Sequence, residues 1–303
     1  MKYRLGDLLC LILPCLVMAV GFVFNPIQRV AASQPASGGQ EKIKLDVHYE
    51  PSSEDVVQIM LDMAEVGEKD LVYDLGCGDG RIVIAAAQQR GARGIGVDLD
   101  PERIKESLAN ARRAGITDRV QFFQENLFQT EIGRATVVML YLYPDVNLKL
   151  RPKLFRELKP STRVVSHSHD METWEPDQTR TASNGHKIYF WVMPANVSGT
   201  WEWTLPGEKD RYALTISQQF QKVSASLQLG SAAVPVKELQ VRGDRFQFTV
   251  ERLIQGKKQT LHFAGRVRGH LMEGTAVETT GSSQKQQTWK ANRIPASMKP
   301  LDS

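Results

Sequence analysis

Cysteine is scarce in this sequence of 303 residues, and its three copies exclude a disulfide-stabilised fold. Cys10 and Cys15 lie in an apolar segment near the N-terminus, so Cys77 stands alone in the rest of the chain. If the N-terminal segment is cleaved, no intrachain disulfide can form. The six histidines also lack the spacing of metal ligands, apart from His167 and His169, and no third ligand accompanies these two. The sequence therefore predicts no metal site.

A run of basic residues is absent as well, although the formal net charge is +4. Residues 1–196 contain 23 Lys and Arg against 25 Asp and Glu, a net charge of −2, whereas residues 197–303 contain 15 against 9, a net charge of +6. Positive charge that is spread in this way is typical of a solvated surface, so we expect no nucleic-acid partner. The contrast between the two parts indicates two domains of different character.

A long apolar run occurs at the N-terminus. Lys2 and Arg4 precede "LLCLILPCLVMAVGFVF" (Leu8–Phe24), and the small residues of Val30–Ala32 suit cleavage by a signal peptidase. The run has 17 residues, which is near the lower limit for crossing a bilayer, so an uncleaved anchor is the alternative. Both interpretations predict that residues 1–32 are a signal peptide or membrane anchor. The folded part is then exported or membrane-anchored, on the outer side of the cytoplasmic membrane in the cell envelope.

Composition and periodicity divide the remaining chain. Residues 33–44 are rich in Gly and Ser and predict a flexible linker. Residues 45–195 alternate between strand and helix patterns, which predicts a parallel sheet with helices on both faces and a ligand site at the carboxyl ends of its strands. The expected helices are Ser53–Ala64, Arg81–Gln89, Pro101–Ala114 and Asn147–Leu158, and the expected strands are Leu71–Leu75, Gly94–Val97, Val120–Phe123, Thr136–Leu140, Arg163–Ser166 and His186–Met193.

Helical periodicity is missing after Pro194. Seven or so short alternating segments, separated by Gly and charged turns, predict a small antiparallel barrel or sandwich over residues 198–294. Residues 295–303 are expected to form a disordered tail. The predicted fold class is therefore α/β, a Rossmann-like doubly wound sheet followed by a small all-β C-terminal domain.

A glycine-rich turn lies in the stretch "VYDLGCGDGRIVIAAA" (Val72–Ala87). A dinucleotide-binding fingerprint would need a third glycine at position 81, where this chain has Arg81. Gly76 and Gly78 let a ligand approach the backbone, while Asp74 and Asp79 disfavour a phosphate there. Carboxylates suit a cationic ligand. S-adenosylmethionine carries a sulfonium and an ammonium and no phosphate.

Two further polar positions follow the next two strands. Asp98 ends a strand 18 residues after Gly80, and an acid at this point can accept both hydroxyls of a ribose. Asp100 is better placed as the cap of the helix that begins at Pro101. Asn126 follows the third strand, where a side-chain acceptor can meet the amino group of adenine.

The segments "YDLGCGDGRI", "GVDLDPERI", "TVVMLYLYPDVNLKLRPKL" and "ELKPSTRVVSHSHDM" resemble the class I S-adenosylmethionine-dependent methyltransferases. More narrowly, they are similar to the FAM173-type protein-lysine methyltransferases and their bacterial relatives, from His48 to Pro194. The resemblance implies that the methionine moiety is held by Asp74, Gly76, Gly78 and Gly80. It also implies that Asp98 binds the ribose and that Asn126 lies beside the adenine, where family members usually have Asp.

The methyl acceptor is less well defined by the sequence. Tyr141 and Tyr143 follow the fourth strand and can enclose an amine, although aromatic packing within a loop explains them equally well. His169 with Asp170 can accept a proton, and structural hydrogen bonding is the alternative. We assign Tyr141, Tyr143 and His169 as the candidate catalytic residues.

The sequence thus predicts methyl transfer from S-adenosylmethionine to nitrogen, with a protein lysine as acceptor, by direct in-line displacement. One alternative is a cell-envelope binding protein that uses the β domain and keeps a degenerate methyltransferase scaffold. The other is a methyltransferase that acts on a small molecule or a lipid.

Overall fold

The computed structural model describes residues 49–254 and 256–301. The predicted signal peptide or anchor and the linker at 33–44 lie outside this part of the chain. Among the residues that the structure describes, no helix combines the length and the apolar character needed to cross a membrane.

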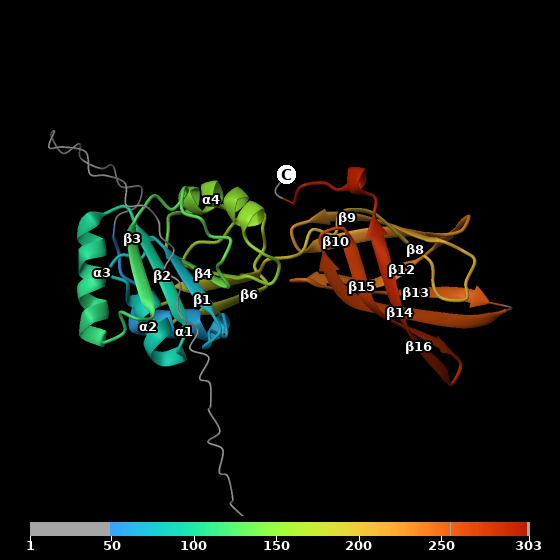
Figure 1. Cartoon of the computed structure of the whole chain (residues 1–303), viewed down its shortest axis with the longest axis horizontal. Coiled ribbons are helices and arrows are strands. Elements are labelled where there is room, and N and C mark those ends of the chain that lie inside the picture. The colour runs from blue at the N-terminus through green and yellow to red at the C-terminus, as the bar shows by residue number, and fades with distance from the viewer. Residues whose placement is uncertain (1–48, 255, 302–303) are drawn as a thin grey trace, which may run out of the picture. The chain divides into compact units, whose positions relative to one another are not determined.

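The first sheet has seven strands in the order β3-β2-β1-β4-β5-β7-β6 (Figure 1). Strands β1 to β5 pair in parallel, whereas β7 is antiparallel to both β5 and β6. The strands are β1 (Leu71–Leu75), β2 (Arg93–Asp98), β3 (Val120–Gln124), β4 (Val137–Leu140), β5 (Arg163–His167), β6 (Gln178–Thr181) and β7 (Lys187–Val192). The chain order reverses between β1 and β4, so their carboxyl ends form the crevice where doubly wound sheets bind ligands.

Helices cover both faces of this sheet, as expected. The helices are α1 (Glu54–Met63), α2 (Arg81–Arg90), α3 (Pro101–Ala114) and α4 (Pro144–Glu157). On one face, α1 and α2 pack against Val72 and Met139, and α2 and α3 enclose Phe122. On the other face, α4 packs against the neighbouring strand residues Tyr73 and Leu140. Successive strand residues point to opposite faces, and this period of two divides the apolar residues between two layers of core.

Local signals in the sequence place the helix ends well. Asp100 caps α3, because its side chain accepts a hydrogen bond of 2.9 Å from the backbone N–H of Glu102. Gly115 ends the same helix in the left-handed conformation, at φ +68°. Ser53 precedes α1, but its hydroxyl donates to Asp55 rather than to the helix backbone.

The structure corrects three expectations about the first sheet. Helix α4 begins at Pro144, three residues before the predicted start, because proline is favoured in the first turn. Strand β6 was not predicted, since its four residues are all exposed and give no apolar signal. The last part of the sheet is also not parallel: β5 and β7 run in opposite directions without a helix between them.

The second sheet contains nine antiparallel strands rather than the seven or so that the pattern predicts. Their order is β11-β10-β9-β8-β16-β15-β14-β13-β12. They are β8 (Gly199–Trp203), β9 (Tyr212–Gln219), β10 (Lys222–Leu229), β11 (Ala232–Val234), β12 (Val236–Arg242), β13 (Arg245–Ile254), β14 (Lys257–Arg268), β15 (Leu271–Thr280) and β16 (Ser283–Arg293). Strand β11 is only three residues long and separated from β12 by Pro235, so it has no periodicity of its own.

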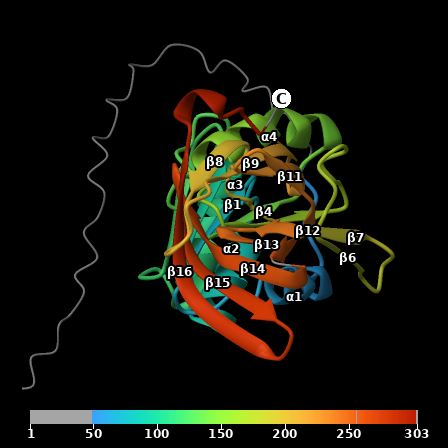
Figure 2. The ribbon, with the colours of Figure 1, turned by 90° about the vertical axis from the view of Figure 1, so that its right-hand side faces the viewer.

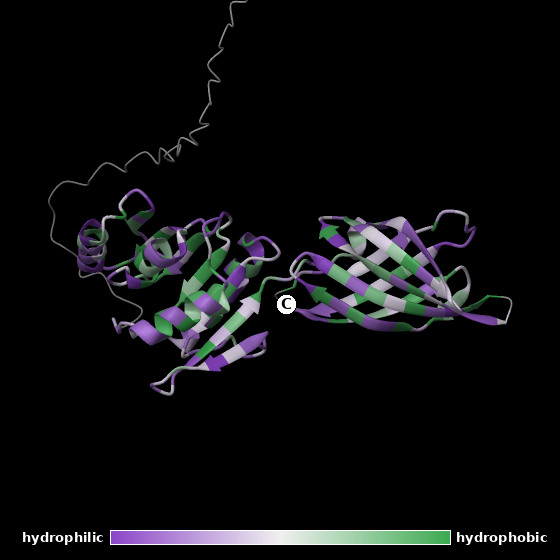
Figure 3. Ribbon diagram, turned by 90° about the horizontal axis from the view of Figure 1, so that it is seen from below, coloured by the Kyte–Doolittle hydropathy of each residue, from purple (hydrophilic) through white to green (hydrophobic). Residues whose placement is uncertain are grey.

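This second sheet curves into a nearly closed barrel (Figure 2), since β10 at one side approaches β12 at the other. Colouring by hydropathy shows residues alternating along its strands (Figure 3), as expected for a sheet with one buried face. Aromatic rings fill the interior: Phe248 stacks on Phe263 at 4.6 Å, and Trp203 stacks on Tyr212 at 4.9 Å. The prediction of a small all-β domain after the α/β sheet is confirmed in its barrel form.

The prediction of a disordered tail from 295 to 303 is wrong for residues 295–301. Pro295–Ser297 forms a short 3₁₀ helix, η1, and the Ser297 hydroxyl accepts a hydrogen bond from the Thr200 N–H. The Lys299 N–H donates to Ser198 Oγ at 2.9 Å. These backbone contacts with the start of β8 were not predictable from a short polar segment. The other domain limits, 45–195 and 198–294, stay predictions; β7 ends at Val192 and β8 begins at Gly199.

Candidate active site

The glycine turn connects β1 to α2 and needs glycine at three positions. Gly76, Gly78 and Gly80 all have positive φ, at +93°, +53° and +79°. A Cβ at Gly76 would lie 2.9 Å from Leu142, and one at Gly80 would lie 2.7 Å from the Phe122 ring. A Cβ at Gly78 would overlap the ring of Tyr49. The turn is therefore bare for two reasons: its backbone conformation and the side chains packed against it.

Asp98 fixes this turn to the end of β2. Its Oδ2 accepts a hydrogen bond of 2.9 Å from the N–H of Gly78, and its Oδ1 accepts one of 2.9 Å from the N–H of Asp100. The N–H groups of Gly76 and Cys77 both donate to the Val97 carbonyl at 2.9 Å. The tips of β1 and β2 thus form one hydrogen-bonded unit, with the carboxylate that the sequence assigns to the ribose at its centre.

Carboxylates gather around the turn. Asp74 is 2% exposed, and burial, with further contributions from Asp98 and Asp79, raises its pKa to about 8. Asp79 is held by Arg81 in an ion pair at 2.6 Å, and the hydrogen bonds from this guanidinium keep the Asp79 pKa below its usual range despite burial. Asp79 therefore has a cationic partner, Arg81. No ion pair of Asp74 is found among the described residues.

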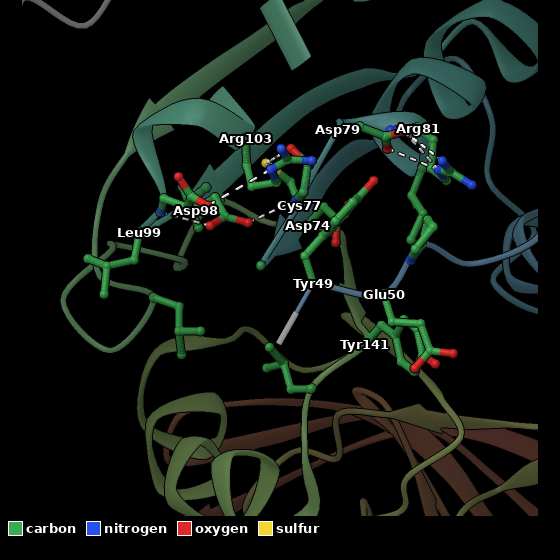
Figure 4. A pocket seen from close by; sticks show the side chains of 18 of the residues that line it. Tyr49, Glu50, Asp74, Cys77, Asp79, Arg81, Asp98, Leu99, Arg103 and Tyr141 are labelled. Atoms are coloured by element: carbon green, nitrogen blue, oxygen red, sulfur yellow. Dashed lines mark hydrogen bonds and ion pairs between the residues drawn. The ribbon is translucent and has the colours of Figure 1, made fainter. Parts of the chain in front are cut away.

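A cavity of about 890 Å³, counted with its open mouth, lies over the turn (Figure 4). Five of the six residues predicted to bind the cofactor line it: Asp74, Gly76, Gly78, Asp98 and Asn126. Gly80 is absent from the lining. It lies at the start of α2, where its carbonyl accepts the first helical hydrogen bond, from Ile84. Its role is to turn the chain rather than to form the wall.

The residues present fit S-adenosylmethionine. A glycine turn that any Cβ would fill gives a flat backbone surface, and a buried carboxylate with a raised pKa favours a cation that restores its charge. Both features match a ligand with a sulfonium and an ammonium. A pyrophosphate would instead face Asp74 and Asp79 directly, which is electrostatically unfavourable.

Asn126 lies in the cavity wall, but its carbonyl is already used. Its Oδ1 accepts a hydrogen bond of 2.9 Å from the N–H of Phe128, which turns the chain after β3. The predicted contact of this oxygen with an adenine amino group thus has to use the second lone pair of the carbonyl. The side-chain NH₂ remains as a donor for an adenine ring nitrogen.

Tyr141 is the candidate catalytic residue that the structure brings into the cavity. Its ring lies 3.9 Å from the ring of His167, centre to centre. Burial, followed by the neighbouring Glu50 carboxylate, raises the pKa of its hydroxyl to about 12. Tyr141 is therefore a neutral phenol at physiological pH.

Tyr143 and His169 lie outside the cavity lining. Tyr143 is 44% exposed and precedes α4 as its N-terminal cap residue. His169 follows a left-handed residue, Ser168, at φ +66°, which turns the chain away after β5. Burial lowers the His169 pKa, so the ring is a neutral base. Their catalytic roles stay predictions.

Sequence reasoning missed the segment of residues 49–52, which forms one wall of the cavity. The Tyr49 ring lies beneath the Arg103 guanidinium at 4.5 Å, and the Ser52 hydroxyl is 2.9 Å from His167 Nδ1. His167 is 1% exposed, and its Nε2 lies 2.8 Å from His186 Nδ1. Burial lowers the His167 pKa to about 4, with a further contribution from His186. No spacing rule in the sequence joins segments more than a hundred residues apart.

Comparisons with known proteins agree with this site. The model of the ANTKMT methyltransferase domain family matches residues 74–178. A protein-lysine N-methyltransferase of Saccharolobus islandicus (strain REY15A) is 44% identical over 151 residues, which cover 48% of this chain and 94% of that protein. The adenine nucleotide translocase lysine N-methyltransferase of Mus musculus is 33% identical over 134 residues, which cover 44% of this chain and 58% of that protein.

Among solved structures, an RNA methyltransferase from Salinibacter ruber in complex with S-adenosyl-L-homocysteine is similar, with 47% sequence identity and a TM-score of 0.47. The matched region covers 52% of this chain and 98% of the chain in that structure. The expected reaction class is confirmed: the chain is a methyltransferase. The fit of the glycine turn and Asp74 supports S-adenosylmethionine as its cofactor. The archaeal relative is covered almost completely at high identity, and the chain therefore belongs to the protein-lysine N-methyltransferase family.

Proposed function

We propose that this protein transfers the methyl group of S-adenosylmethionine to the ε-nitrogen of a protein lysine. The observation that carries the proposal is the continuity of one cavity, which extends from the carboxylates at the glycine turn to the hydroxyl of Tyr141. One end of this cavity suits the cationic cofactor, and the other end, with its polar aromatic residue, suits an amine. Both ends belong to the same cavity. Relatives that carry the same core are named as lysine methyltransferases, which supports a protein acceptor.

In this proposal the first domain holds the cofactor by its backbone and acids. Asp74 and the backbone surface of the turn at Gly76 and Gly78 face the methionine moiety, while Gly80 turns the chain into α2. Asp98 accepts the ribose hydroxyls and Asn126 lies beside the adenine. S-adenosylmethionine supplies an electrophilic methyl group on a positively charged sulfur.

The acceptor end has to deliver an amine without its proton. A lysine ammonium has no lone pair, so the site must remove one proton and hold the nitrogen in line, about 3 Å from the methyl carbon. We assign Tyr141 to orienting the amine through its hydroxyl. Tyr143, which is exposed beside the site, would contact the chain that carries the lysine.

Methyl transfer to protein is tested with the full chain and tritium-labelled cofactor. Label should enter lysines of the cell's protein fraction, located by mass spectrometry as a mass increase of about 14 Da per methyl, and not the lipid extract. Label in the lipid extract alone would support the small-molecule alternative. Failure to bind S-adenosylmethionine at millimolar concentration would support the degenerate-scaffold alternative.

We also propose that residues 1–32 direct the protein to the cell envelope, as a cleaved signal or as an anchor that associates with the membrane. The support is the basic and apolar pattern of Lys2 to Phe24. Cell fractionation with N-terminal sequencing of the mature chain tests this. A mature chain that starts near position 33 indicates cleavage, an intact chain in the membrane fraction indicates an anchor, and an intact chain in the cytoplasm contradicts both.

A further inference from the structure

We propose that the Glu50 carboxylate binds the substrate's lysine ammonium and receives its proton. This inference rests on the proposed function and names a residue that the sequence pattern did not assign. Glu50 belongs to the segment that closes one side of the cavity, four residues before α1. It would act beside Tyr141, from which it is separated by more than ninety positions in the chain.

The position of Glu50 joins it to the cofactor cavity. It lines the same cavity as Asp74 and Gly76, and its carboxylate contributes to the raised pKa of the neighbouring Tyr141 hydroxyl. Figure 4 shows Glu50 and Tyr141 together on one side of the cavity, with Asp98 and Leu99 on the other side. The Glu50 side chain is exposed, so an amine that arrives from solvent meets this carboxylate at the rim.

The other acids of the cavity are committed elsewhere. Asp79 is paired with Arg81, and Asp98 accepts two backbone N–H groups. Asp100 caps α3 through the N–H of Glu102. Glu125 accepts a hydrogen bond from the Thr130 hydroxyl at 3.1 Å. Asp74 is buried at the opposite, cofactor end. Glu50 is thus the cavity acid that lies beside Tyr141, the candidate residue at the acceptor end.

Neighbouring contacts hold the Glu50 backbone in place. Two residues further on, the Ser52 hydroxyl is 2.9 Å from His167 Nδ1, and the Ser52 carbonyl accepts a hydrogen bond of 2.8 Å from Arg81. On the other side, Tyr49 is covered by Arg103. His167, the imidazole beneath Tyr141, is neutral because its pKa is lowered to about 4. It therefore adds no positive charge that would compete with an ammonium for Glu50.

The bound ammonium passes one proton to the Glu50 carboxylate, which returns it to solvent at the open mouth of the cavity. The freed lone pair forms the N–CH₃ bond as the S–CH₃ bond breaks. The sulfur keeps that electron pair and becomes a neutral thioether, while the methylated amine carries the positive charge away. The Tyr141 hydroxyl orients the nitrogen and keeps its own proton.

The test compares full-length wild type with Glu50→Gln, using a random lysine–serine copolymer as acceptor and saturating S-adenosylmethionine. Glu54→Gln is the matched control, because Glu54 lies in the first turn of α1 and outside the cofactor cavity. We expect Glu50→Gln to lower kcat/KM for the copolymer by roughly 10- to 100-fold, as loss of a general base and an ion pair does. The dissociation constant for S-adenosylhomocysteine should stay within about threefold, since Glu50 is placed at the acceptor end.

The variant Glu50→Asp tests whether the carboxylate charge at position 50, rather than a structural role of Glu50, supports the activity. It keeps the charge on a shorter side chain and should recover part of kcat/KM. The proposal is overturned if Glu50→Gln keeps wild-type kcat/KM, or if it loses affinity for S-adenosylhomocysteine in parallel with activity. If the wild type binds S-adenosylhomocysteine but methylates no lysine in the copolymer or in cell protein, the proposed function fails, and this inference fails with it.

Discussion

At the scale of single residues, Asp74 and Asp98 show how one site uses two carboxylates differently. Asp74 is buried beside other acids, and its pKa is raised to about 8, so the free protein holds it largely protonated at neutral pH. Asp98 accepts two backbone N–H groups and thereby shapes the turn. In the proposed site, Asp74 responds to the charge of the ligand, whereas Asp98 fixes the backbone geometry of the turn.

Asp98→Ala should abolish measurable cofactor binding. The substitution removes the proposed ribose acceptor and leaves the N–H groups of Gly78 and Asp100 without their partner; hydrogen bonds to a charged group contribute about 1.5–3 kcal/mol each. Isothermal titration with S-adenosylmethionine measures the loss. Tyr143→Phe, which changes an exposed hydroxyl outside the cavity, should bind the cofactor like the wild type. Equal losses in both variants would contradict the assigned roles.

Asp74→Asn should change the pH dependence of stability in the free protein. An aspartic acid releases its proton near pH 3.8 in the unfolded chain but near pH 8 in the folded one. Between these values the folded state binds more protons, so the wild-type free energy of unfolding falls as pH rises from about 4 to about 8. The variant lacks this titration and should show a flatter profile. Denaturant unfolding at several pH values measures it, and parallel profiles would refute the raised pKa.

At the scale of elements, the glycine turn is the part of the fold whose sequence is most constrained. Gly78→Ala should weaken cofactor binding at least tenfold, because its Cβ would overlap the Tyr49 ring at a φ of +53°, a conformation unfavourable to other residues. Gly115→Ala is the control: its φ is also positive, but its Cβ meets no atom within 4 Å. It should cost only about 1 kcal/mol of stability and leave affinity unchanged. Titration calorimetry and thermal unfolding of both variants decide this.

The sequence predicted those elements whose signals are local. The strand of Leu71–Leu75 and the helix of Pro101–Ala114 were placed with their observed ends, since apolar periodicity and capping residues define them. Strand β6 was missed because its residues are all exposed and the strand only completes a sheet edge. The wall made by Glu50 and its neighbours was missed for another reason. A tertiary contact between residue 50 and residue 141 has no periodic signature.

At the scale of the whole molecule, the described chain builds separate hydrophobic cores. One fills the barrel and includes Trp201, Phe263 and Ala291, and the others lie on the two faces of the first sheet. The barrel interior is closed by stacked aromatic rings, with Trp203 in contact with four of them. Cofactor binding and barrel stability should thus respond to different substitutions.

Trp203→Ala tests this separation. Removing a buried tryptophan should cost the barrel about 3–5 kcal/mol of stability, because Trp203 is 4% exposed and surrounded by aromatic rings. Thermal unfolding should show an earlier transition of β-sheet signal by circular dichroism. Affinity for S-adenosylhomocysteine, measured below that transition, should equal that of the wild type. A joint loss of affinity would mean that the barrel supports the cofactor site directly.

Placing Asp74 beside the sulfonium, as proposed above, also predicts a pH dependence for cofactor exchange. Methyl transfer removes the sulfonium charge, so the spent nucleoside leaves the protein with one positive charge fewer than the fresh one brought in. An acid that ionises near pH 8 beside this position attracts the fresh nucleoside more strongly as it loses its proton. Higher pH should consequently favour binding of S-adenosylmethionine over S-adenosylhomocysteine. The buried group that destabilises the free protein as it ionises would then promote replacement of the product by fresh cofactor.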